Sequence, residues 1–78
     1  MLLLKLVKET SSKVVYNYFP EQKEHFGTVA IDKTTGEVTD VQISINDKHE
    51  RYMHHALSRI VEFFENGTYK DQDVVAWN

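Results

Sequence analysis

Three of the 4 histidines in this 78-residue chain fall close together, so a metal site is the first chemistry to consider. The stretch from His49 to His54 approaches the zinc-protease pattern H-E-x-x-H, but its second histidine comes one residue late. At about 100° per residue on a helix, the two side chains point about 140° apart and cannot bind one ion. We therefore predict no metal site and interpret His49 as a partly buried, structural histidine.

A basic group lies on the other side of the same predicted helix. Arg51, His54, His55 and Arg59 share a surface there and could hold an acidic partner or a phosphate backbone. The whole chain, however, has 9 Lys and Arg against 12 Asp and Glu, a net charge of -3. Because nucleic-acid binders need a basic surface, this balance disfavours nucleic acid as a partner, and a solvated face is the simpler interpretation. Weak nucleic-acid recognition through this face stays the alternative function.

Patterns for covalent catalysis are missing from the sequence. It has no cysteine and no glycine-flanked serine, and its 3 glycines are isolated rather than grouped in a phosphate-binding loop. The carboxylates of Asp71 and Asp73 lie in a polar segment with no apolar pocket to tune them. A domain this small also offers little room for a ligand pocket of about 300 Å³. We therefore predict that the protein is not an enzyme and uses no cofactor.

The elements that must position these residues follow from the spacing of apolar side chains. Four apolar runs of strand length, 2–8, 13–19, 26–32 and 37–45, are joined by connections too short for a parallel crossover. Residues 47–66 then adopt a helical period, with Asp47 and Glu50 resembling a capping box and Asn66-Gly67 a stop signal. We expect one α+β domain over 1–78, in which a four-stranded antiparallel meander has the helix packed on one face.

The parity of the strands predicts which side chains face the helix, because partners across a ladder share a face. Leu6 is expected to pair with Tyr16, and a three-residue loop, Thr34-Thr35-Gly36, to join the last two strands through a G1 bulge. The helix-facing strand residues are then Leu2, Leu4, Leu6, Val14, Tyr16, Tyr18, Val29, Ile31, Val41, Ile43 and Ile45. The helix adds Met53, Ala56, Leu57, Ile60, Phe63 and Phe64.

The opposite face of the sheet carries two apolar rows. One contains Leu3, Phe19 and Phe26, and the other contains Val7, Val15 and Ala30. The tail, 69–78, includes Trp77, whose exposure would forfeit about 2 kcal/mol, so we expect the tail to pack on this face or to pair with a sheet edge. The patch around Leu3 is larger than such a tail can surely hide, and exposed apolar patches mark interfaces. We therefore predict that a protein partner or a second copy, as in a homodimer, binds this face.

The stretch 51–60, together with the ending Val75-Ala76-Trp77-Asn78, resembles a group of short bacterial proteins of unknown function. The resemblance covers roughly the last third of the chain. It implies a bacterial or phage origin and brings no activity with it. It also makes Arg51, His54, His55, Arg59 and Trp77 the first positions to test.

The apolar start of the chain does not fit a signal peptide. No basic residue precedes it, Lys5 interrupts it, and no small-residue cleavage site follows. No other segment approaches the roughly 20 apolar residues of a membrane span. We expect a cytoplasmic protein without membrane contact, and the lack of cysteine agrees with that compartment.

Overall fold

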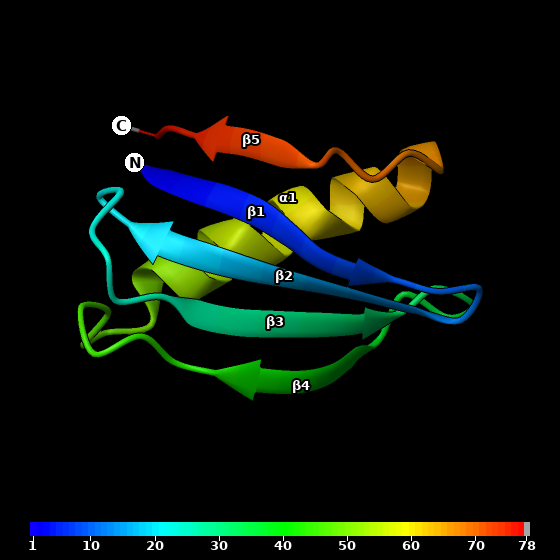
Figure 1. Cartoon of the computed structure of the whole chain (residues 1–78), viewed down its shortest axis with the longest axis horizontal. Helices are drawn as coiled ribbons and strands as arrows, with labels where there is room; N and C mark the ends of the chain where they lie inside the picture. Colours follow the sequence, from blue (N-terminus) through cyan, green and yellow to red (C-terminus); the bar gives the residue numbers. More distant parts are fainter. Residues whose placement is uncertain (78) are drawn as a thin grey trace.

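A computed structural model describes residues 1–77 as a five-stranded antiparallel sheet with one helix packed against it (Figure 1). The elements in chain order are β1 (Leu2–Glu9), β2 (Lys13–Pro20), β3 (Gly27–Asp32), β4 (Val38–Gln42), α1 (Arg51–Asn66) and β5 (Gln72–Val75). In space the strand order is β4-β3-β2-β1-β5. The predicted α+β class and the four-strand meander are confirmed, and the sheet gains a fifth strand.

The fifth strand comes from the segment predicted to be a docked tail. It pairs antiparallel with β1, from Leu2 opposite Val75 to Lys5 opposite Gln72. Of the two placements expected for the tail, pairing with an edge is correct and packing across the outer face is wrong. The physical reason is that the edge of β1 offers backbone N–H and C=O groups, which a second strand satisfies. Asn78, the last residue of the predicted tail, lies outside the described residues.

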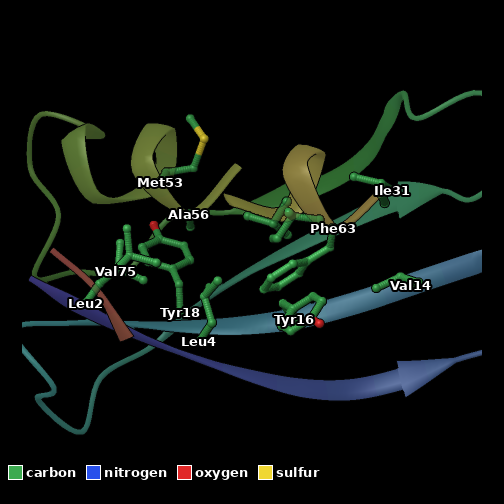
Figure 2. Close-up of a cluster of buried hydrophobic side chains, with 12 residues drawn as sticks. Leu2, Leu4, Val14, Tyr16, Tyr18, Ile31, Met53, Ala56, Phe63 and Val75 are labelled. Atoms are coloured by element: carbon green, nitrogen blue, oxygen red, sulfur yellow. The ribbon is translucent and has the colours of Figure 1, made fainter. Parts of the chain in front are cut away.

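The face of the sheet toward α1, here called the inner face, forms the core (Figure 2). The expected pairs Leu6–Tyr16 and Leu4–Tyr18 are confirmed. Tyr16 lies against Phe63 of the helix, with ring centroids 5.7 Å apart. The buried core residues are Leu2, Leu4, Val14, Tyr16, Tyr18, Val29, Ile31, Met53, Ala56, Ile60, Phe63 and Val75. Parity therefore assigned the central strands to the correct face.

The β3–β4 connection differs from the predicted three-residue loop. The amide of Gly36 donates to the carbonyl of Asp32, and the amide of Asp32 donates to the carbonyl of Glu37, so residues 33–36 form the loop. The extra residue shifts the register to Ile31 opposite Val38, and a bulge then restores the expected pairing of Val29 with Val41. Gly36 has the predicted left-handed backbone, with φ 80°.

The end of β4 corrects the predicted core. The strand stops at Gln42, so Ile43 and Ile45 are 40% and 72% exposed rather than buried. Past Gln42 the chain is held by Ser44, whose amide donates to the hydroxyl of Tyr18 at 3.0 Å. This bond turns the Ser44 amide toward the inner face, and the alternation of the strand is not continued by Ile43 and Ile45.

The helix begins at Arg51, four residues later than predicted, because Glu50 has a left-handed backbone with φ 58° and makes no side-chain capping bond. Asp47 caps the helix over a longer reach, accepting hydrogen bonds from the amides of Tyr52 at 3.1 Å and Met53 at 2.9 Å. His49 consequently precedes the helix and is exposed, so its interpretation as a partly buried helix residue is wrong.

The end of the helix follows the predicted stop signal. Gly67 has φ 73°, and its amide donates to the carbonyl of Phe64 while the amide of Thr68 donates to that of Phe63. These two bonds are those of a Schellman motif.

Tyr18 connects the inner face to both ends of the β4–α1 loop. Its hydroxyl accepts from the amide of Ser44 and donates to Asp47 Oδ2 at 3.0 Å. Burial, together with the carboxylate of Asp47, raises the pKa of Tyr18 to about 12. The neutral phenol is therefore the form that the fold requires.

Candidate functional site

The sheet face away from α1, here called the outer face, brings together the first of the two apolar rows predicted for it. Leu3 and Phe19 are cross-strand partners on β1 and β2. The rings of Phe19 and Phe26 lie 5.4 Å apart, and Phe26 is 50% exposed. Val74 of β5 pairs with Leu3 from the other side and is also half-exposed. Val74, Leu3, Phe19 and Phe26 thus form a continuous strip across the sheet, here called the apolar row.

A polar row runs beside the apolar row. It consists of Gln72, Lys5, Asn17, Thr28 and Gln42. Lys5 Nζ lies 5.4 Å from the ring centroid of Phe19, and the hydroxyl of Thr28 donates to Asn17 Oδ1 at 3.1 Å. Lys5 thus lies over part of the apolar row and leaves its ends, Phe26 and Val74, half-exposed.

The second predicted row on this face is interrupted. Val15 pairs with Ala30 as expected, but β1 has a bulge after Leu6 and places Lys8 opposite Val15. Val7 therefore does not join the row, and it is 56% exposed. The continuous apolar surface of the outer face is therefore the apolar row.

The end of the chain does not cover the outer face within residues 1–77. Val75 is buried in the core on the inner side, and Trp77 packs against that same core. The ring of Trp77 stacks on His55 at 3.8 Å with an interplanar angle of 10°. Trp77 is therefore separated from Leu3, Phe19 and Phe26, with which it was grouped as a candidate binding residue.

The basic helix residues do not form one open surface. Arg59 Nη1 donates to Asp73 Oδ2 of β5 at 2.6 Å, and Arg59 also faces Glu62 at 3.6 Å. His55 is occupied by its stack with Trp77. Arg51 and His54 remain exposed. Two of the four predicted residues thus fasten the C-terminal segment to the helix, which leaves a weaker cationic surface than the sequence suggests.

The clearest hollow in the described part of the chain lies at the N-terminal end of α1. It is a pocket of about 430 Å³, lined by residues from the β2–β3 turn, the β4–α1 loop, the first helical turn and both ends of the chain. Figure 1 shows these segments meeting at one end of the sheet. The expectation that the domain has little room for a pocket of about 300 Å³ is therefore wrong. The pocket lies between surface loops, outside the hydrophobic core.

Glu21 is the acidic group of this pocket. Its Oε2 accepts from the amino group of Met1 at 2.7 Å and from the hydroxyl of Tyr52 at 2.8 Å. These two donors hold the pKa of the Glu21 carboxyl below its usual range, and the carboxylate raises the pKa of Tyr52. Tyr52 in turn meets Trp77 edge to face, with ring centroids 5.4 Å apart.

Sequence reasoning missed this pocket because its residues are far apart along the chain. Glu21, Ile45, Arg51 and Trp77 belong to no common motif. The turn Glu21-Gln22 gave no signal either, because both residues have positive φ in the structure although neither is glycine. Such left-handed residues are uncommon and are often retained at functional sites.

No three His, Asp or Glu side chains of residues 1–77 are arranged to hold a metal ion. In the same part of the chain, no helix is long and apolar enough to cross a membrane.

Comparisons with protein-family models, with curated proteins and with solved structures find no match to this chain. The resemblance of its last third to short bacterial proteins therefore stays a prediction.

Proposed function

We propose that this protein is a non-catalytic, cytoplasmic module that self-associates through the outer face of its sheet. The observation that carries the proposal is the apolar row, in which Val74 and Phe26 are 46% and 50% exposed and no segment of residues 1–77 lies over them. Contiguous apolar surface of this kind is characteristic of interaction sites.

The edges of the sheet are less suited to association than its face. β4 carries a bulge against β3, and Asp40 adds a charge to the strand. β5 has only 4 residues. Bulges, charges and short strands are the devices that prevent edge-to-edge pairing. The remaining surface able to bury apolar area is the outer face.

A second copy of the chain suits this face in area and in charge. Five strands at about 4.8 Å spacing and about six residues each give a face of roughly 500 Å². Two such faces bury about 1,000 Å² in total, the lower end for a specific interface, so the dimer is expected to be weak. Lys5 on β1 and Asp40 on β4 lie on opposite sides of the face, so a two-fold axis along the strands brings unlike charges toward each other.

The experiment is sedimentation equilibrium over a wide concentration range. The apparent mass is expected to rise from 9.1 kDa toward twice that value. Phe26→Glu should weaken the dimer by about tenfold or more, because two like charges meet near the axis. Ile45→Glu is the matched control, since Ile45 is 72% exposed and lies off the outer face. A chain that stays monomeric up to about 1 mM contradicts the proposal.

The nucleic-acid alternative has less support. Arg59 and His55 are engaged with Asp73 and Trp77, which leaves Arg51 and His54 as the exposed members of the basic group. Two such groups give at most a shallow dependence of affinity on salt. A steep loss of DNA or RNA affinity with salt would favour this alternative over self-association.

A further inference from the structure

The pocket at the N-terminal end of α1 has a size and a lining that suit a small ligand. Its volume of about 430 Å³ falls within the range of small-molecule sites. Its lining combines aromatic, aliphatic, acidic and basic side chains, contributed by segments that are distant along the chain. The balance of the charges decides which ligands it can accept.

The acidic groups at the pocket are already satisfied by the protein. Glu21 accepts from Tyr52 and from the amino group of Met1. Asp47 is 2% exposed and accepts three hydrogen bonds, from the hydroxyl of Tyr18 and from the amides of Tyr52 and Met53. Because these carboxylates are neutralised or fully bonded, they have little capacity left to attract a cation.

The basic groups at the pocket are not satisfied in the same way. Lys48 and Arg51 line it and are exposed, and neither forms an ion pair with another of residues 1–77. Lys48 and Arg51 are thus the charged side chains of the pocket that remain available to bind a ligand of opposite charge. A guanidinium group offers a planar fork of donors that matches a carboxylate or phosphate.

Besides the charged groups and the polar Asn46 and His49, the pocket has apolar walls. The rings of Tyr52 and Trp77 pack edge to face, and Ile45 is 72% exposed in the same pocket. Ile45 is a large apolar side chain left in water, and a ligand would cover it. Aromatic walls favour a planar apolar body over an extended aliphatic one.

The backbone at the pocket is held in an uncommon conformation. The non-glycine residues with positive φ in the described chain are Glu21, Gln22 and Glu50, which lie at the pocket or next to its lining residues. Strained residues of this kind persist where the surrounding structure fixes them, and they cluster at ligand sites. The left-handed turn at Glu21 and Gln22 places Glu21 against Tyr52. The left-handed Glu50 directly precedes Arg51, the first residue of the helix.

We propose that this pocket binds a small organic anion, in which a carboxylate or phosphate headgroup contacts Arg51 and Lys48 and a planar apolar body lies against Tyr52, Trp77 and Ile45. This site is separate from the outer face and does not depend on self-association.

Trp77 is the only tryptophan of the chain, so its fluorescence reports on the pocket directly. The untagged protein is titrated with phenylacetate and with phenyl phosphate, and phenylacetamide serves as the uncharged analogue. A saturable change is expected for at least one anion, with a dissociation constant of about 1 mM for a fragment of this size. Saturation by one anion alone identifies the preferred headgroup.

The variants locate the headgroup. Arg51→Gln and Lys48→Gln should each weaken the bound anion by about five- to tenfold, since each removes a charge-assisted contact. Lys13→Gln is the matched control, because it removes the same charge from an exposed residue at the other end of β2. Phe26→Glu should bind the anion as the parent does, so a failed dimer and a failed pocket give different results.

Two outcomes overturn the proposal. One is phenylacetamide binding as tightly as phenylacetate, which would mean that the cations do not recognise the ligand. The other is a flat titration with both anions while circular dichroism shows a folded chain.

Discussion

The two faces of the sheet are built from alternating residues of the same strands, yet they have different surroundings. Leu4 on the inner face is fully buried beneath the helix, whereas its neighbour Leu3 on the outer face is only partly covered. The buried polar side-chain atoms of residues 1–77 all have hydrogen-bond partners. A short chain with one helix can thus complete only one face of its sheet, and its stability is concentrated on that face.

The sharpest test of this difference is a pair of leucines on β1. Leu4→Ala should lower the free energy of unfolding by about 3 kcal/mol, because it leaves a cavity in the core. Leu3→Ala should cost less, about 1 to 1.5 kcal/mol, since its side chain is only partly buried and water can fill the space that the truncation leaves on the open face. Urea unfolding of the two variants at a low, fixed concentration checks the contrast. Equal losses would mean that the outer face is as well packed as the inner one.

A pair of glycines tests how closely the inner face is packed. A Cβ atom on Gly27 would lie 2.2 Å from Cε1 of Tyr18 and 2.6 Å from the carbonyl oxygen of Gln42. Gly27→Ala should therefore lower the free energy of unfolding by about 2 to 3 kcal/mol through overpacking. Gly67→Ala meets no atom within 4 Å and should cost only about 1 kcal/mol, from its left-handed backbone. Thermal unfolding of both variants gives the comparison.

The inner face also predicts a loss of stability at high pH. Burial is the main cause that raises the pKa of Tyr16 and Tyr18 above 10.0, so the folded state holds their protons longer than the unfolded state does. Stability from these phenols is complete below pH 10 and is lost as pH rises toward the folded pKa values. Each should contribute a loss of about 1 kcal/mol by about pH 11.

Urea unfolding between about pH 9 and pH 11 measures this loss, and Tyr18→Phe serves as the comparison. The variant should show a shallower decline because one of the two phenols is gone. A decline as steep as that of the parent would assign the effect to other groups. The outer face holds no tyrosine among its paired residues, so no phenol on that face contributes to the decline.

Much of the fold could be predicted because local rules determine it. The parity of β1 and β2 follows from alternation alone, and the helix end follows from Gly67. The predicted β3–β4 register is correct from Ala30 back to Thr28. It is correct only because a bulge offsets the extra residue of a loop that is longer than predicted. The helix start was wrong because Asp47 is held by Tyr18 from another strand, which no local pattern encodes.

The candidate sites also contain a part that could be predicted from the sequence and a part that could not. Leu3, Phe19 and Phe26 could be grouped from strand parity, whereas Val74 required the pairing of β5 with β1. The pocket could not be foreseen, since Glu21 and Trp77 meet there only after the sheet and helix have assembled. The engagement of Arg59 likewise depends on where β5 places Asp73.

The ion pair between Arg59 and Asp73 joins the helix to the edge of the sheet, and its removal should change stability least. Arg59 is 28% exposed and Asp73 17%, so the pair is partly shielded from water. A double-mutant cycle with Arg59→Gln and Asp73→Asn should give a coupling energy of about 0.5 to 1 kcal/mol. The cycle of Arg59 with Glu62, which is 61% exposed and 3.6 Å away, should give about 0.3 kcal/mol. A larger coupling to Glu62 than to Asp73 would mean that this ion pair does not fasten β5 to the helix, and that β5 is held by its pairing with β1 and by the burial of Val75.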